Sequence, residues 1–251
     1  MNARDIEKYT KDYLSDECDF ERYMVVFRRN KILEILQKYQ PDNVLEIGCG
    51  MNSIFSYYNN FKKAFIVEPS MTFIHKAKEE LQGKNIVFLN DFIENRVEIF
   101  ENNQIDFIIL SSLLHEVKEP KVFLRNILNA VKQDTIIHIN VPNSESFHLL
   151  WAYESGLIEK IGKLSDRAKK LQQHNTFSLR SLEELVSCLD DTLNIQLLER
   201  GSYFVKPFNH FKMSLCLQEN ILNDQLLEGL EKMIKYIPEF GAEIFVNIKK
   251  C

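Results

Sequence analysis

The spacing of the apolar residues changes near residue 43 of the chain. Before this point apolar side chains recur every three or four residues, which is typical of amphipathic helices, and Pro41 ends the pattern. After it, short apolar runs alternate with longer amphipathic stretches, and Ser70 and Ser178 stand where serine is a favoured helix N-cap. The runs predict strands at 43–47, 64–67, 86–89, 105–110 and 135–141. This alternation predicts a parallel α/β sheet with right-handed crossovers.

The C-terminal part of the chain varies this pattern. Residues 143–175 predict helices inserted after the fifth strand. The apolar runs that follow predict strands at 194–199 and 203–206, on either side of Gly201, and at 242–249. Helices are expected between these last strands. The chain is long enough to bury one full α/β core with a small addition.

The first predicted strand ends in the order Glu-Ile-Gly-Cys-Gly, with Glu46, Gly48 and Gly50. Glycines at this point free the backbone and let a ligand approach closely, while the next helix offers unpaired N–H groups. A Gly-x-Gly is by itself a weak signal. The preceding acid can accept hydrogen bonds from the loop backbone or from a cationic ligand group, and a pyrophosphate-binding loop has no need of it.

Polar residues also follow the next three strands, as Glu68-Pro69, Asp91-Phe92 and Ser111. Ligands bind at the carboxyl ends of the strands in sheets of this kind. A carboxylate at Glu68 can accept both hydroxyls of a ribose, although a solvated turn acid would look the same. The carboxylate of Asp91 can accept a hydrogen bond from an adenine amino group while the ring of Phe92 lies along the base. Alternatively, Asp91 is a helix N-cap and Phe92 is a core residue. Ser111 would line the channel toward the reacting group.

Together these positions resemble the class I S-adenosylmethionine (SAM)-dependent methyltransferases, whose first motif is acid-x-Gly-x-Gly. The resemblance covers about residues 43–141, and it departs from many members at Asn52-Ser53, where they carry a further glycine. It implies a Rossmann-like α/β fold with a seven-stranded, mostly parallel sheet and an antiparallel last strand. SAM would be the cofactor, with its methionine end at the glycine loop. Residues 1–42 would form either amphipathic helices that cover the sheet edge or a helical lid over a SAM-binding domain of residues 43–251.

The segment after the fourth strand ends in Leu-Leu-His, at His115, and lacks an Asn-Pro-Pro-Tyr element. It looks like the methyltransferases that act on small molecules, in which a histidine near this place faces the transferable methyl. A neutral imidazole can remove a hydroxyl proton near neutral pH. His174 precedes Phe177-Ser178-Leu179 in an arrangement similar to one on the acceptor side of such enzymes. The sequence leaves open which histidine is the base, and a structural role for either.

The segments 199–208 and 242–245 look like a group of bacterial methyltransferases associated with sugars and surface polysaccharides. Tyr203 and Lys206 can contact an anionic acceptor there, or hold a strand end. A basic cluster is either a solvated face or a lid that attracts a phosphorylated acceptor; it comprises Lys160, Lys163, Arg167, Lys169 and Lys170. The expected reaction is O-methylation of a small polar acceptor. Candidates are a sugar, or a phosphorylated or nucleotide-activated precursor in capsule or lipopolysaccharide biosynthesis.

Composition narrows the classes of partner. The net charge of −5 over 251 residues gives no global attraction to nucleic acid or to an anionic membrane. Five cysteines without a CxxC pair indicate reduced thiols, and no metal-ligand spacing is present. No apolar run approaches ~18 residues. We expect a cytoplasmic protein without metal, whose N-terminal helices offer apolar surface on which two chains can pair as a homodimer.

Several alternatives stay open from the sequence. The acceptor atom can be nitrogen or carbon of another small metabolite, and the chain can be a non-catalytic SAM-binding partner subunit. A nicotinamide dehydrogenase is disfavoured because the third glycine of its fingerprint is replaced by Ser53. A nucleic-acid methyltransferase is disfavoured by the charge and by the segment after the fourth strand.

Overall fold

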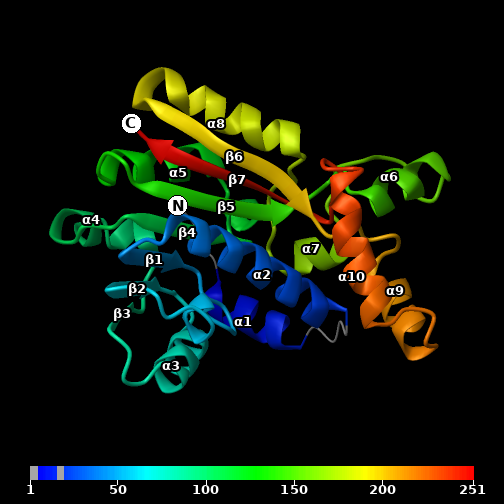
Figure 1. Cartoon of the computed structure of the whole chain (residues 1–251), viewed down its shortest axis with the longest axis horizontal. Coiled ribbons are helices and arrows are strands. Elements are labelled where there is room, and N and C mark those ends of the chain that lie inside the picture. Colours follow the sequence, from blue (N-terminus) through cyan, green and yellow to red (C-terminus); the bar gives the residue numbers. More distant parts are fainter. Residues whose placement is uncertain (1–4, 16–19) are drawn as a thin grey trace.

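The computed structural model describes residues 5–15 and 20–251, apart from the side chains of 190–192; Cys18 lies outside this part. The described residues form one seven-stranded sheet in the order β3-β2-β1-β4-β5-β7-β6 (Figure 1). The strands are β1 (Asn43–Ile47), β2 (Lys63–Val67), β3 (Ile86–Leu89), β4 (Phe107–Ser111), β5 (Ile136–Pro142), β6 (Ile195–Tyr203) and β7 (Glu243–Lys250). β1 to β5 are parallel, and β7 is antiparallel to both β5 and β6. The predicted sheet, with its antiparallel last strand, is confirmed.

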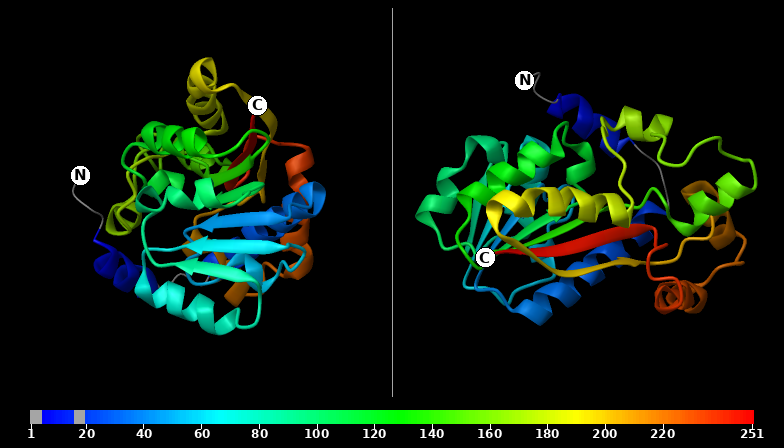
Figure 2. Two further views of the ribbon diagram at one scale, coloured as in Figure 1. Left: turned by 90° about the vertical axis from the view of Figure 1, so that its left-hand side faces the viewer. Right: turned by 90° about the horizontal axis from the view of Figure 1, so that it is seen from above.

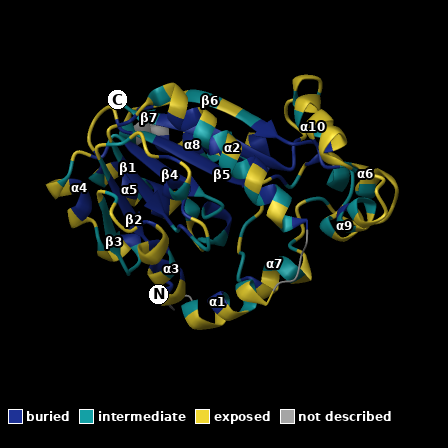
Figure 3. Cartoon of the chain, turned by 60° about the horizontal axis from the view of Figure 1, so that its bottom comes forward, coloured by how far each residue is buried: buried dark blue, intermediate teal, exposed yellow. Residues whose placement is uncertain are grey.

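Helices cover both faces of the sheet (Figure 2). One face carries α2 (Glu21–Tyr39), α3 (Met71–Glu80), α9 (His210–Gln218) and α10 (Asp224–Lys232). The other carries α4 (Glu98–Asn102), α5 (Pro120–Ala130) and α8 (Leu179–Leu193). The remaining helices are α1 (Ile6–Leu14), α6 (Phe147–Glu154) and α7 (Asp166–Lys170), with short 3₁₀ turns η1 (Ile54–Ser56), η2 (Ile93–Asn95), η3 (Leu114–Glu116) and η4 (Met233–Lys235). α6 and α7 lie beyond the end of β5, and α1 lies beside α7 (Figures 1 and 3).

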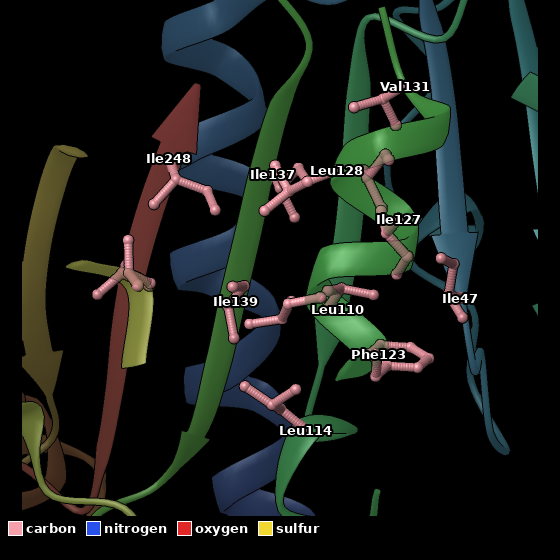
Figure 4. Close-up of a cluster of buried hydrophobic side chains, with 14 of the residues drawn as sticks. Ile47, Leu110, Leu114, Phe123, Ile127, Leu128, Val131, Ile137, Ile139 and Ile248 are labelled. Carbon is pink, nitrogen blue, oxygen red and sulfur yellow. The ribbon is translucent and has the colours of Figure 1, made fainter. Parts of the chain in front are cut away.

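Side chains of the central strands alternate between the two faces, as the two-residue period of a strand requires. On the face of α5, Ile137 and Ile139 of β5 lie among Leu110, Phe123 and Ile127 (Figure 4). All five are 5% exposed or less. Burial of each such side chain contributes about 1.5–3 kcal/mol relative to exposure. This continuous core fixes the strand ends from which the site is built.

The N-terminal helices divide into two roles. α2 buries Met24, Phe27 and Leu36 in the same hydrophobic cluster as Val44 of β1, so it shares the core of the sheet. The ring of Phe27 stacks on Phe204 with 4.0 Å between centroids. α1 contributes little to that core. Of these two helices, α1 lies outside the core of the sheet, whereas α2 is packed into it.

Local signals place several helix starts correctly. The hydroxyl of Ser70 accepts the N–H of Phe73 at 3.4 Å, and that of Ser178 accepts the N–H of Ser181 at 3.3 Å. Both N-cap predictions are confirmed. Between β1 and β2 the chain forms only the 3₁₀ turn η1, where the loop binds back to Glu46 near the end of β1.

The two strands expected around Gly201 are one strand, β6. Gly201 pairs with Phe245 of β7 within the ladder, and a Cβ on Gly201 would lie 3.0 Å from the Phe245 ring. The glycine thus makes room for a cross-strand ring and does not mark a turn. β6 ends at Tyr203, before Phe204, which adopts a positive φ of 57°.

In the described part of the chain, no helix is both long and apolar enough to cross a membrane. The four described cysteines, Cys49, Cys188, Cys216 and Cys251, are free thiols.

Candidate active site

A cavity of about 440 Å³ opens at the carboxyl ends of β1, β2 and β4. Its wall is completed by α1, α2, α7, the segment between β6 and α9, and the start of β7. These elements come from both ends of the chain and meet on one side of the sheet (Figure 3). The volume lies in the usual range for small-molecule sites.

The glycine loop forms the cavity wall after β1. Gly48 and Gly50 have φ angles of 77° and 55°, a region that other residues enter only at a cost. The N–H of Gly48 donates to the carbonyl of Val67 at 2.9 Å, which ties the loop to β2. A Cβ on Gly50 would meet no described atom within 4 Å, whereas one on Gly48 would lie 3.7 Å from Leu113. The loop therefore leaves space for a ligand against its backbone.

Glu46 holds this loop in shape. Its Oε2 accepts the hydroxyl of Ser53 at 2.5 Å, and its Oε1 accepts the N–H of Ile54 at 3.0 Å. Burial raises the pKa of Glu46 to about 7, and the nearby charge of Glu68 adds to this, against the lowering effect of the two hydrogen bonds. Glu46 lines the cavity, so an incoming ammonium group would favour its ionised form.

Glu68 connects two loops at the end of β2. Its Oε2 accepts the N–H of Gly50 at 3.1 Å, and its Oε1 accepts the N–H of Ser70 at 2.8 Å. The side chain is 5% exposed and lines the cavity together with Pro69. The carboxylate thus stands between the glycine loop and the N-terminus of α3. Its predicted contact with a ribose stays a prediction.

Asp91 and Phe92 follow β3 but are not among the residues that line the cavity. The Oδ1 of Asp91 accepts the side-chain N–H of Asn95 at 2.7 Å, and Arg96 Nε lies 3.1 Å from its Oδ2. The hydrogen bond from Asn95 is the largest of several contacts that lower the pKa of Asp91. The carboxylate in this structure caps its own loop, and the predicted adenine contact stays a prediction.

The end of β4 brings three residues to the cavity, Ser111, Ser112 and Leu113. Ser112 has a φ of 49°, which is unusual for a residue with a side chain. Its hydroxyl is buried without a hydrogen-bond partner among the described residues. Strained backbone of this kind concentrates at functional sites. Ser111 was indicated by its place after the fourth predicted strand. Nothing in the sequence indicates the positive φ or the buried hydroxyl of Ser112.

The two candidate bases differ in position. His115, on η3, is 4% exposed and lines the cavity. His174 is exposed and does not line it. The backbone N–H groups of His174 and Asn175 both donate to the carbonyl of His115, at 2.9 and 3.0 Å. The segment around His174 therefore positions η3 from behind, and His115 is the histidine at the cavity.

A buried ion pair faces His115. Both Nε and Nη2 of Arg28 donate to Glu243 at the start of β7, with Nε at 2.9 Å from Oε2. Burial alone would raise the pKa of Glu243, but Arg28, the hydroxyl of Tyr203 and the charge of His115 together lower it. Arg28 and Glu243 line the cavity. Glu243 is thus an ionised group that the sequence analysis did not single out.

Tyr203 was expected to contact an acceptor. It is 4% exposed, does not line the cavity, and donates its hydroxyl to Glu243. The side-chain N–H of Asn140 donates to the same hydroxyl at 3.1 Å. Tyr203 therefore has the other role that the sequence left open, which is structural.

Lys206 lies on the cavity wall and is 7% exposed. Of the basic cluster at 160–170, only Arg167 lines the cavity, and the four lysines are exposed. Arg167 Nη1 donates to Nδ1 of His210, another lining residue, at 3.1 Å. Nothing in the sequence around His210 indicates that α9 begins at the cavity.

In the part of the chain that the structure describes, no group of three or more His, Cys, Asp or Glu side chains is arranged to hold a metal ion.

The sheet order and the Glu-x-Gly-x-Gly loop at its switch point define a class I methyltransferase. The chain belongs to the methyltransferase domain family, whose profile matches residues 20–189. It is a SAM-dependent methyltransferase. No curated protein matches the chain by sequence.

Solved structures with a similar fold carry the same activity in their descriptions. The plantazolicin methyltransferase BpumL in complex with S-adenosylhomocysteine (SAH) is 18% identical, with a TM-score of 0.60 over 98% of this chain and 95% of that chain. The N-methyltransferase NodS from Bradyrhizobium japonicum WM9 in complex with SAH is 11% identical, with a TM-score of 0.55 over 98% and 96%. A SAM-dependent methyltransferase from Archaeoglobus fulgidus is 15% identical, with a TM-score of 0.50 over 93% and 100%. Likeness at these identities concerns the fold.

The cavity fits SAM by the chemistry of its wall. The glycine loop leaves room against its backbone at Gly50, and two carboxylates, Glu46 and Glu68, stand on either side of it. A carboxylate suits the ammonium of the methionine end, and another suits ribose hydroxyls. SAM is the cofactor of this enzyme.

Proposed function

We propose that this enzyme transfers a methyl group to a hydroxyl of a small polar acceptor, with His115 as the general base. The observation that carries the proposal is the place of His115. It is a buried imidazole on the wall of the same cavity as Glu46, the glycine loop and Glu68. A base in that cavity has use only when the acceptor must lose a proton.

SAM supplies an electrophilic methyl group on a sulfonium, and the protein aligns the nucleophile with it. In this proposal the acceptor hydroxyl donates to a ring nitrogen of His115, which takes the proton as the oxygen attacks. The imidazolium that forms is stabilised by the ionised carboxylate of Glu243, which is close enough for the two charges to interact. Arg28 and Tyr203 keep Glu243 ionised and in position.

α1 would exclude water during the reaction. Tyr9 and Tyr13 line the cavity, and the hydroxyl of Tyr9 donates to Glu116 next to His115 at 3.3 Å. The Thr10 hydroxyl lies 2.9 Å from the hydroxyl of Ser70, at the start of α3. Of the residues of α1, which the structure describes in full, only Thr10 is buried, so the helix can open for substrate entry at modest cost.

The acceptor class we favour is a sugar, or a phosphorylated or nucleotide-activated glycan precursor. The basic side chains of Lys206 and Arg167 on the cavity wall support an anionic acceptor. N-methylation of an amine is the second candidate. It is supported by Glu21 and Glu116 on the same wall, which would attract an ammonium group, and by the similar fold of an N-methyltransferase.

The test is an activity screen with SAM that carries a deuterated methyl group. The purified protein is incubated with separate pools of sugar phosphates, nucleotide sugars and small amines, and mass spectrometry detects the labelled product. We expect a labelled product from the first two pools, with the methyl on oxygen. Labelled amines alone would replace this proposal by the second candidate, and no product from any pool would contradict both.

The role of His115 is tested with His115→Ala and the control His75→Ala. His75 is an exposed residue of α3 away from the cavity. We expect His115→Ala to bind SAH normally and to lose turnover, while His75→Ala retains both. Full turnover in His115→Ala would reject it as the base.

A further inference from the structure

Two cations and a histidine stand at the part of the cavity wall farthest along the sheet order from the cofactor loops; we call them the cluster. Lys206 follows β6, Arg167 belongs to α7, and His210 is the first residue of α9. These three residues line one cavity, although more than thirty positions separate Arg167 from Lys206 in the chain. Figure 1 shows α7, α9 and the end of β6 at the same end of the molecule, beyond β5.

The contact between Arg167 and His210 determines the tautomer of the imidazole. A guanidinium only donates hydrogen bonds, so Nδ1 of His210, at 3.1 Å from Arg167 Nη1, is an acceptor. The proton of the neutral ring is then on Nε2. That atom is buried and has no hydrogen-bond partner among the described residues. A buried N–H donor in this position lacks an acceptor that a ligand can supply.

The surroundings of His210 favour a negative charge. Burial lowers the pKa of His210 to about 2, and the charges of Lys206, Arg167 and Arg28 lower it further in the same direction. The pKa of His148 is lowered in the same way to about 2, first by burial and then by the charges of Lys206 and His210. Two neighbouring imidazoles are thus held neutral beside positive charge.

Two carboxylates of the cavity wall, Glu21 and Glu243, are engaged by arginines. Glu21 lies 3.6 Å from Arg167 Nη2 and 3.8 Å from His210 Nδ1, and it also contacts Arg28. Glu243 is engaged by the bidentate contact with Arg28. α9 begins at the cluster, with Asn209 as the N-cap that accepts the N–H of Lys212 at 3.0 Å. Its positive end adds to the field at His210.

We propose that Lys206, Arg167 and the Nε2–H of His210 form a binding subsite for a phosphoryl group of the acceptor. The three side chains come from separate elements, line one cavity, and lie close enough for the charges of Lys206 and Arg167 to act on His210. A phosphoryl group carries more charge and more acceptor oxygens than a carboxylate, so it suits a site with several donors. The assignment of this phosphoryl group to the acceptor rests on the proposed function. The subsite itself depends only on the cluster.

The subsite is tested by calorimetric titration of the SAH-bound protein with inorganic phosphate, and with acetate at equal ionic strength. We expect phosphate to bind and acetate to bind more weakly. Lys206→Met should weaken phosphate binding about tenfold, and His210→Phe, which keeps the ring volume, about threefold. The control Lys169→Met removes an exposed lysine of α7, and should change phosphate binding less than about twofold.

Several results would overturn the subsite. They are no phosphate binding by the wild type, equal binding of acetate, or unchanged phosphate affinity in Lys206→Met. SAH affinity of each variant reports folding. If Lys206→Met loses SAH binding, Arg167→Gln takes its place, since its side chain is 38% exposed.

Failure of the subsite and failure of the proposed function are distinguishable. Phosphate binding that depends on Lys206, without turnover on any acceptor pool, supports the subsite and contradicts the function. Turnover that depends on His115, without any phosphate effect, supports the function and contradicts the subsite.

Discussion

The two sides of the cavity are built in different ways. On the cofactor side, Glu46 and Glu68 bind backbone N–H groups within eighteen positions, at Ile54, Ser70 and Gly50. On the acceptor side, contacts join residues far apart in the chain. Arg28 and Glu243 are 215 positions apart, and Arg167 and His210 are 43 apart. The cofactor side is therefore encoded in short motifs, and the acceptor side arises from assembly of the whole chain.

This difference predicts that variants on the two sides alter different quantities. Cofactor-side variants should change SAH affinity, and acceptor-side variants should change turnover or the stability of the assembled fold. The predictions below are ordered from the largest expected effect to the smallest.

The largest effect is expected for His115→Ala. Loss of a general base lowers the turnover number by about 10²–10⁴-fold. SAH affinity should stay within about twofold, because Glu46 and Glu68 hold the loops of the cofactor side. Single-turnover kinetics together with SAH titration measure both. A parallel loss of SAH affinity would mean that His115 also contributes to the cofactor side of the cavity.

The next effect is expected for Glu243→Gln, which removes the bidentate, buried carboxylate partner of Arg28 and leaves the single contact with Glu21. Breaking such a pair lowers the free energy of unfolding by about 3–5 kcal/mol, measured by denaturant unfolding at neutral pH. Glu239→Gln is the control, since Glu239 is 57% exposed in a long contact with Arg200, and surface pairs contribute about 0–1 kcal/mol.

The pH dependence of Glu243→Gln follows from the direction of the pKa shift. The pKa of Glu243 is lowered in the folded state, so its stabilising contribution is present above the unfolded pKa of about 4.3 and is lost as pH falls through the folded pKa. The stability difference between wild type and variant should therefore shrink below about pH 4. A difference that stays constant to lower pH would show that the carboxylate charge is not involved.

A smaller effect is expected for the pH dependence of SAH binding. The pKa of Glu46 is raised to about 7 in the fold, so the fold favours the protonated carboxyl. The stabilisation that the proton gives the ligand-free protein is lost as pH rises from about 4.3 toward 7. An ammonium group attracts only the ionised form, so SAH affinity should rise by up to about tenfold per unit between pH 5.5 and 7. Glu46→Gln should flatten this profile; an unchanged profile would remove Glu46 from the cofactor site.

The smallest effect is expected for Gly50→Ala, with Gly83→Ala as a matched control. Both glycines have positive φ, and a Cβ on either meets no described atom within 4 Å. Each substitution should lower the free energy of unfolding by about 1–2 kcal/mol. Only Gly50 lines the cavity, so only Gly50→Ala should also weaken SAH binding, which calorimetry measures. Equal SAH affinity in the two variants would place the ligand away from the loop backbone.

The sequence indicated the fold and the cofactor loop through local signals. The sheet, its antiparallel last strand and the N-caps at Ser70 and Ser178 are confirmed. The glycine loop and Glu68 line one cavity because strand ends in a parallel sheet share an edge. Asp91 is the exception, since Asn95 and Arg96 beside it bind the carboxylate in its own loop.

The acceptor side was predicted less well for the opposite reason. The sequence offered His115 and His174 equally, and only the burial of one and the exposure of the other separates them. Tyr203 was assigned to the acceptor, yet it binds Glu243 inside the fold. Glu243 went unnoticed because an acid that begins a strand is unremarkable until its partner is known.

Short motifs and residue periodicity determined the fold class, the reaction class and the place of the cofactor loop, because each depends on neighbours within a few residues. Only the tertiary structure decided which side chains face the acceptor. Arg28, Arg167, His210 and Glu243 come from four helices and strands, and they share one cavity through the packing of those elements on the sheet. Long-range packing of this kind depends on the sum of many apolar contacts, which no local stretch of sequence contains.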